Sequence, residues 1–176
     1  MRTMMIQNIN DKELYGLYLE QRILIPEDHH TVQEILNWPP GEEWFVNFSY
    51  IREDDQVPTK WQKLLWFKYS DDSGCYLPMF QSQESLTIVG AYIKYETFRH
   101  IGNSHPIPPF TVVKFGVEQR RDVDDGKLYI SYLVNGVSVG RKEINEYRSY
   151  AKVRVMTGNN KNNVKNTVSE FKFGKL

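Results

Sequence analysis

The chain has 176 residues, 40% hydrophobic and 14% aromatic, and a chain of this length buries roughly two thirds of its unfolded surface on folding. We therefore expect one globular domain. Basic and acidic residues balance at 22 each, so no net charge favours nucleic acid or an anionic membrane as a partner.

Two features bear on the compartment. Cys75 is the only cysteine, which excludes an internal disulfide and favours a reducing environment. The first ten residues lack an apolar stretch of signal-peptide length, and no window reaches the ~20 apolar residues of a membrane helix. These features favour the cytoplasm but leave the compartment open, and we expect no membrane insertion.

The N-terminal region is the least β-like part of the sequence. Thr31-Val32-Gln33-Glu34 matches a capping box and is followed by Ile35-Leu36, which predicts a short helical turn. Trp38-Pro39-Pro40-Gly41 must end that turn, because prolines supply no backbone donors. We predict that residues 1–42 form an extension packed on a domain formed by residues 43–176.

Strand signals begin after Gly41. Residues 43–52 alternate between polar and apolar, which predicts a half-buried strand. Residues 61–69 are apolar on both faces, as in a central strand covered on both sides. Residues 75–81 and 85–95 form a predicted strand pair, and residues 97–109, rich in proline and glycine, predict a long surface loop.

The last third carries the strongest turn signals. Asn135-Gly136 lies between two alternating runs and is the favoured pair for a two-residue hairpin turn. Residues 151–156 alternate as a strand with one buried and one solvated face. Closely spaced strands without βαβ units predict an all-β protein, an antiparallel two-sheet jelly-roll sandwich.

The order of these segments resembles a known family. It is carried by Trp44-Phe45-Val46-Asn47-Phe48, by Leu65-Trp66-Phe67-Lys68-Tyr69, by residues 128–136 and by Val168-Ser169-Glu170-Phe171-Lys172-Phe173. The chain is similar over about residues 43–174 to the concanavalin A-like lectin/glucanase superfamily, which includes laminin G-like domains and galectins. The resemblance implies a sandwich that binds sugars, binds proteins, hydrolyses glycosides or serves a structural role.

An enzyme is the least favoured of these classes. Retaining glycosidases of this superfamily resemble one another in a Glu-x-Asp-x-Glu strand, which sets two carboxylates ~5 Å apart, and no such string occurs here. The four histidines fall in loops without a nucleophile elbow. We therefore predict a noncatalytic module.

A metal site has one candidate. Asp122, Asp124 and Asp125 precede Gly126 and resemble the opening of a calcium loop, although Leu133 occupies the twelfth position, where an acidic ligand is needed. A tight hairpin turn explains the same residues without an ion. Calcium and a simple turn are both retained as interpretations of this segment.

Sugar recognition needs an aromatic platform and fixed polar groups. We expect Trp44 and Trp66 to be core residues, and the galectin signature His-x-Asn-x-Arg is absent. The function predicted first is carbohydrate binding; the alternative is a protein-interaction subunit that uses the polar loop 158–163. The candidate ligand-binding residues lie at the start of the predicted strand 61–69 or in predicted turns and loops: Trp61, Asp71, Asp72, Arg99, His100 and Asn103.

Overall fold

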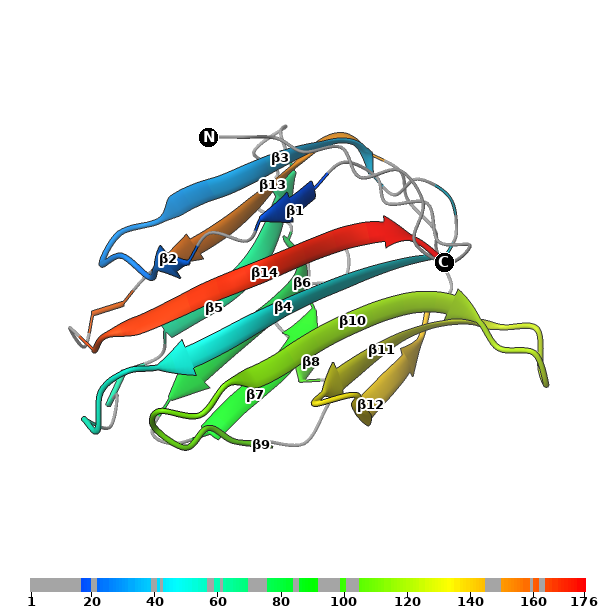
Figure 1. The fold of residues 1–176 in the computed structure, drawn as a ribbon. Coiled ribbons are helices and arrows are strands. Elements are labelled where there is room, and N and C mark those ends of the chain that lie inside the picture. The colour runs from blue at the N-terminus through cyan, green and yellow to red at the C-terminus, as the bar shows by residue number, and fades with distance from the viewer. Residues whose placement is uncertain are drawn as a thin grey trace.

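The computed structural model describes residues 17–19, 22–38, 41, 43–56, 59–60, 62–69, 76–83, 86–91, 99–100, 105–144, 150–158, 160–161 and 164–176. The regular elements within these ranges are β-strands, arranged as two antiparallel sheets (Figure 1). No helix in this part of the chain has the length and apolar character to cross a bilayer.

The first sheet contains seven strands in the order β1-β14-β4-β10-β11-β12, with β2 also paired to β14. Figure 1 shows β14, β4 and β10 running side by side across the front of the molecule. The bounds are β1 (Leu17–Leu19), β2 (Ile23–Leu24), β4 (Trp44–Arg52), β10 (Val113–Arg121), β11 (Leu128–Val134), β12 (Val137–Glu143) and β14 (Asn166–Lys175).

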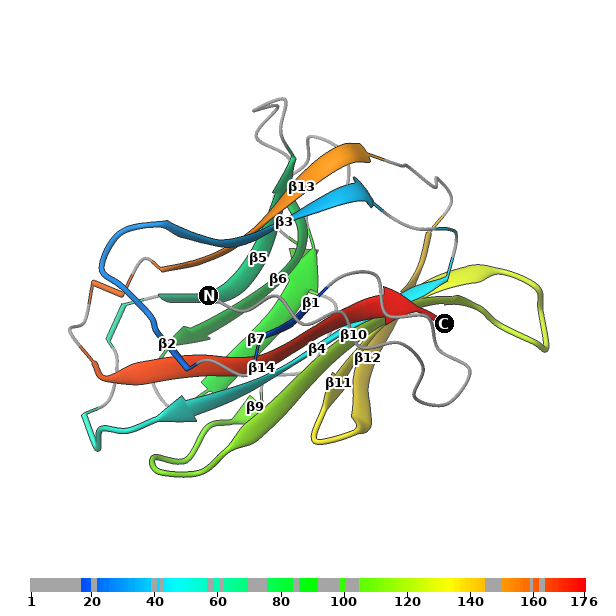
Figure 2. The ribbon, with the colours of Figure 1, turned by 45° about the horizontal axis from the view of Figure 1, so that its top comes forward.

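The second sheet also has seven strands, in the order β3-β13-β5-β6-β7-β8, and β9 pairs with β7. The tilted view of Figure 2 separates β3 and β13 of this sheet from β14 and β4 of the first. The bounds are β3 (His30–Trp38), β5 (Gln62–Tyr69), β6 (Tyr76–Gln83), β7 (Leu86–Ala91), β8 (Arg99–His100), β9 (His105–Pro106) and β13 (Tyr150–Gly158). The predicted two-sheet sandwich is confirmed.

Aromatic side chains fill the space between the sheets. Trp38 of β3 stacks on Phe173 of β14 with ring centroids 4.4 Å apart, and it lies 4.6 Å from Trp44 and 5.2 Å from Phe67. Trp38 therefore contacts both sheets at once. The predicted burial of Trp44 and Trp66 is confirmed, since they are 1% and 0% exposed.

The predicted helical turn at residues 31–36 is wrong, because these residues belong to β3 and pair with β13. The three-residue spacing of buried Val32, Ile35 and Trp38 resembles a helical period, but the strand is irregular at two points: the register with β13 shifts at Val32, and Asn37 has a φ of 55°. A helix cap is worth about 1 kcal/mol. Burying one such apolar side chain contributes roughly 1.5–3 kcal/mol, so packing overrides the local signal.

The described part of the predicted N-terminal extension contains three strands. β1 and β2 pair with β14 of the first sheet, and β3 pairs with β13 of the second. Backbone hydrogen bonds therefore attach residues before position 43 to both layers of the sandwich.

The first sheet contains two hairpins, β10–β11 and β11–β12. The β11–β12 turn has Asn135 at φ 50° and Gly136 at φ 80°, the backbone expected of a two-residue Asn-Gly turn, so that prediction is confirmed. The loop that joins β10 to β11 projects beyond the other strands in Figure 1.

Candidate functional site

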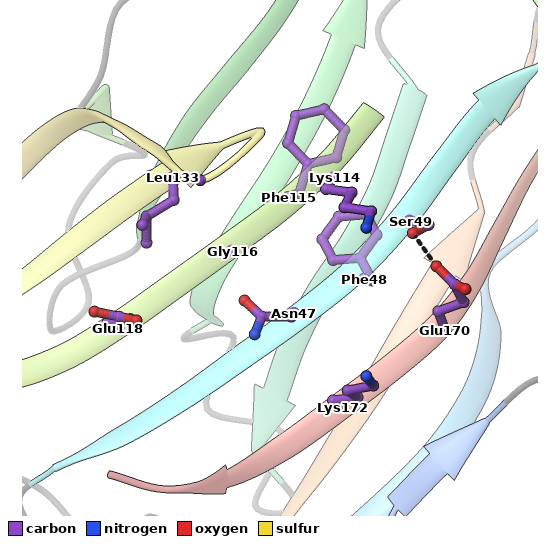
Figure 3. Close-up of a pocket in the computed structure, with 11 residues that line it drawn as sticks. Asn47, Phe48, Ser49, Lys114, Phe115, Gly116, Glu118, Leu133, Glu170 and Lys172 are labelled. Atoms are coloured by element: carbon purple, nitrogen blue, oxygen red, sulfur yellow. Dashed lines mark hydrogen bonds between the residues drawn. The ribbon is translucent and has the colours of Figure 1, made fainter. Parts of the chain in front are cut away.

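A hollow of about 410 Å³ lies on the face of the first sheet that points away from the core. Its walls come from β4, β10, β11 and β14, four neighbouring strands (Figure 3). Its polar lining residues are Asn47, Ser49, Lys114, Glu118, Glu170 and Lys172. Because they stand on paired strands rather than on long loops, the sheet backbone fixes their spacing.

Strand alternation puts these side chains on one face. In β4, Val46 and Phe48 are buried in the core, whereas Asn47 is exposed on the opposite side. Asn47 pairs with Gly116 of β10 and with Lys172 of β14. Paired residues share a sheet face, so the alternation of β4 determines which residues of its neighbours line the hollow.

Gly116 forms the floor of the hollow. A Cβ atom at this position would lie 2.6 Å from Asn47 Oδ1 and 3.5 Å from Leu133 Cβ. The missing side chain therefore lets the Asn47 amide rest over the sheet. A glycine inside a strand marks a close approach, and Gly116 within residues 110–119 is the one sequence signal that points to this site.

A β-bulge in β14 positions Glu170. The register between β14 and β4 shifts between Ser169 and Lys172, and Glu170 has a φ of 53°, in the left-handed region that favours glycine. The Ser49 hydroxyl donates a hydrogen bond of 2.5 Å to Glu170 Oε2. Bulges re-aim side chains, and this one directs Glu170 toward Ser49 of the neighbouring strand.

The charges of the hollow are mixed. Lys114 and Lys172 stand on the strands on either side of β4, and Glu118 lies further along β10, with Oε2 4.0 Å from Arg120 Nη1. Leu133 adds an apolar wall. The arrangement offers hydrogen-bond donors and acceptors around a small apolar surface, which suits a polar organic ligand.

The predicted ligand-binding residues do not meet in this hollow where the structure describes them. Arg99 and His100 form β8, which pairs with Gly90 and Ala91 on the second sheet. Trp61, Asp71, Asp72 and Asn103 lie outside the described residues, as does Cys75. These assignments stay predictions.

Asp122 of the predicted calcium loop is engaged by its own hairpin. Its Oδ1 accepts a hydrogen bond of 2.9 Å from the Asp124 backbone N–H, and its Oδ2 accepts one of 2.7 Å from Arg141 Nη1. These bonds, with the backbone contribution first, hold the pKa of Asp122 below its ordinary value. The carboxylate thus closes the loop and ties it to β12.

Asp125 is engaged in the same way. Its Oδ1 accepts a hydrogen bond of 2.8 Å from the Lys127 backbone N–H, and its Oδ2 accepts one of 2.8 Å from the Tyr129 hydroxyl. This second bond raises the pKa of Tyr129. In the part of the chain that the structure describes, no three His, Cys, Asp or Glu side chains gather as ligands for an ion. The calcium assignment to Asp122, Asp124 and Asp125 stays a prediction.

A separate cluster lies on the second sheet. The His29 ring meets Trp66 edge-on at 4.8 Å, and Lys63 Nζ lies 4.9 Å from the Trp66 ring centre. Desolvation against these neighbours, followed by repulsion from Lys63, lowers the pKa of His29. Gly158 permits this packing, because a Cβ there would meet the Asp28 carbonyl oxygen at 2.2 Å.

Comparison with known proteins gives matches in structure only. No family model matches the sequence, and no curated protein is significantly similar to it. The structure is similar to the carbohydrate recognition domain of Emp47p, with a TM-score of 0.62 and 9% identity over 95% of this chain and 89% of that one.

Two enzymes are similar to a comparable degree. An endo-β-1,4-glucuronan lyase from the fungus Trichoderma reesei has a TM-score of 0.58 and 10% identity, over 99% of this chain and 91% of that one. An endo-1,3-β-glucanase from Streptomyces sioyaensis has a TM-score of 0.60 and 14% identity, over 88% and 76%. The chain therefore has the concanavalin A-like lectin/glucanase fold, an architecture shared by sugar-binding domains and by glycan-cleaving enzymes.

Proposed function

We propose that this protein is a noncatalytic carbohydrate-binding module and that the hollow over Gly116 is its binding site. The observation that carries the proposal is the convergence of polar side chains from three paired strands on an open face floored by glycine. The fold supports the proposal to the extent that it also occurs in a carbohydrate recognition domain.

The chemistry of the hollow matches that of a sugar. A pyranose presents hydroxyls that both donate and accept hydrogen bonds, and it has apolar C–H surfaces. The Asn47 amide can donate and accept, Glu118 accepts, and Lys114 donates, while Leu133 provides apolar contact. Side chains fixed on a sheet lose little additional freedom when a ligand binds.

The spacing of the carboxylates supports binding rather than glycoside hydrolysis. Glu118 is level with Phe45 of β4, whereas Glu170 is close to the level of Ser49 and lies on the other side of β4. Strand geometry places the two backbones roughly 15 Å apart. Glycoside hydrolysis by two carboxylates needs them about 5–9.5 Å apart. The hydrogen bond from the Ser49 hydroxyl holds the Glu170 carboxylate beside Ser49.

A glycan array followed by an NMR titration of ¹⁵N-labelled protein tests the proposal. We expect at least one oligosaccharide class to shift the amide signals of Asn47, Gly116 and Lys172. Asn47→Ala should weaken binding by about tenfold, the loss expected for a buried polar contact. Gln33→Ala, which removes an amide from β3 of the other sheet, should leave binding unchanged. Absence of binding to every glycan at millimolar concentration would overturn the proposal.

A second candidate, a protein-docking subunit, is favoured by apolar side chains beside the hollow. Ile51 of β4 pairs with Thr167, which pairs with Leu24, and Leu24 and Val112 are 57% and 51% exposed. Two exposed apolar side chains, at either end of this cross-strand row, suit a partner that presents its own apolar side chains. Leu24→Ser and Val112→Ser should abolish capture of such a partner while leaving any glycan binding intact.

A further inference from the structure

The bulge in β14 adds one residue to the face that carries the hollow. Val168 and Phe171 are both buried in the core, and the register with β4 shifts in this segment. A regular strand places a single outward residue between two such core residues, whereas here Ser169 and Glu170 both lie between them. Glu170 is exposed and lines the hollow, so it is the residue that the bulge brings to this face.

The hydrogen bond from Ser49 fixes the Glu170 carboxylate beside β4. Ser49 is only 5% exposed, and its hydroxyl donates to Glu170 Oε2 (Figure 3). The φ of 53° at Glu170 is a strained backbone for a residue with a Cβ. The cost of that strain and the gain from one such hydrogen bond are of the same order, so the arrangement adds little net stability. A strained residue held by a neighbouring side chain is typical of a ligand-contact position.

The second oxygen of this carboxylate is left for a ligand. Glu170 Oε1 forms no hydrogen bond or ion pair within the part of the chain that the structure describes. Lys114 of β10 is level with Ser49, and Figure 3 shows the Lys114 and Glu170 side chains on either side of Ser49. An acceptor and a donor therefore flank the same point of β4. A sugar hydroxyl matches this pair, because it donates one hydrogen bond and accepts others.

We propose that Glu170 determines the specificity of the site and that the ligand is a neutral saccharide with a free hydroxyl that donates to Glu170 Oε1. Ser49 is the positioning residue that holds the carboxylate for this contact. The proposal rests on the proposed function and names the ligand class of the same site. A hydrogen bond to an ionised acceptor is stronger than a neutral one, and a ligand without the hydroxyl leaves that acceptor unpaired. An acidic group at the same point would face a like charge.

The test compares neutral oligosaccharides with their methyl ethers. The probes are hexasaccharides of β-1,4-glucose, β-1,3-glucose, β-1,4-mannose and β-1,4-galactose, each with its per-O-methylated counterpart. Any other neutral binder from the glycan array joins the panel in the same two forms. Methylation keeps the oxygen acceptors and removes every O–H donor. Calorimetry or NMR titration should show that the free form binds about tenfold more tightly or better, as expected for a hydrogen bond to a charged group.

Variants locate this contact at Glu170. In Glu170→Gln the amide oxygen accepts the bond from Ser49 and the NH₂ group faces the ligand, so the acceptor is lost. The ratio of free to methylated affinity should then fall about tenfold. Ser49→Ala should lower the same ratio roughly threefold, because the carboxylate is no longer held, and Ser49→Thr, which keeps the hydroxyl, should restore it. Glu34→Gln, at an exposed glutamate of β3 on the other sheet, should leave the ratio unchanged. Circular dichroism checks that all variants are folded.

The outcomes separate this inference from the proposed function. Equal binding of free and methylated forms, an unchanged ratio in Glu170→Gln, or array binding confined to acidic glycans overturns the inference and leaves carbohydrate binding in place. A ratio that falls in Glu170→Gln but not in Ser49→Ala overturns the positioning role of Ser49. Absence of binding by the whole panel, together with a negative glycan array, overturns the proposed function itself.

Discussion

The hollow and the β10–β11 hairpin loop are both rich in charged groups, but they use them differently. In the loop, the carboxylate oxygens of Asp122 and Asp125 accept hydrogen bonds from residues of the same two hairpins. In the hollow, polar groups from β4, β10 and β14 meet over a glycine and face solvent. A cluster that is close in sequence closes its own turn, whereas the polar side chains of the hollow come from distant segments and are the ones that we propose for ligand binding.

Filling the floor of the hollow should have the largest effect. In Gly116→Val, the added Cβ alone would lie 2.6 Å from Asn47 Oδ1. The Asn47 side chain must therefore move, and the hollow loses volume. We expect glycan binding to weaken by more than tenfold, about 1.4 kcal/mol. Valine favours strands, so the melting temperature should not fall. Calorimetry and thermal denaturation measure the two effects.

Gly126 in the hairpin loop is the matched control. Its φ is 70°, and a Cβ there would meet nothing within 4 Å. Gly126→Ala should therefore cost about 1 kcal/mol of folding free energy from backbone strain and leave glycan binding unchanged. If Gly116→Val and Gly126→Ala changed glycan affinity equally, the hollow would not be distinguished from the hairpin loop as the binding region.

The bulge at Glu170 gives the next largest effect. With φ at 53°, a residue with a Cβ is strained by about 1–2 kcal/mol relative to glycine. Glu170→Gly and Glu170→Ala both lose the Ser49 hydrogen bond, so their difference isolates the backbone. We expect the glycine variant to be about 1 kcal/mol more stable in urea denaturation. Equal stability would show that the left-handed backbone at this position carries no cost.

The hairpin loop should show a smaller effect that depends on pH. The hydrogen bonds to Asp122 lower its pKa below the ordinary 3.8, so the carboxylate favours the folded state above that pH. This contribution is lost as pH falls through the folded pKa. Asp122→Asn should lower the melting temperature slightly at pH 7, and the difference from wild type should shrink as pH falls below 3.8. A difference that grew on acidification would contradict the sign.

The smallest expected effect is the pH dependence of stability that comes from His29 beside the second sheet. Its cause is desolvation rather than hydrogen bonding. Desolvation, with repulsion from Lys63, lowers its pKa below the ordinary 6.5, so the neutral ring favours the folded state. Its contribution is complete above pH 6.5 and is lost as pH falls through the lower folded pKa. NMR titration should give a His29 pKa below 6.5, and Lys63→Met should raise it. An unchanged value in that variant would exclude repulsion from Lys63.

Much of the framework could be predicted from local patterns. The Asn135-Gly136 turn, the central position of β5 and the buried side of Val153 and Val155 follow from periodicity and turn chemistry, and the structure confirms them. The capping box at Thr31 gave a wrong prediction of a helical turn. A helix cap contributes about 1 kcal/mol, which is less than the free energy gained by packing Trp38 against both sheets.

The residues that line the hollow could not be predicted from local sequence patterns. Asn47, Gly116 and Lys172 are far apart in sequence and meet only through the pairings of β4 with β10 and of β4 with β14. The sequence pattern around Glu170 is that of an ordinary alternating strand. The bulge that directs its side chain to Ser49 is visible only in the structure. The sequence by itself determined that the chain forms an antiparallel β-sandwich, because side-chain alternation is a local property. Only the tertiary structure decided which polar residues share a face, because strand order and register are set by packing over the whole chain.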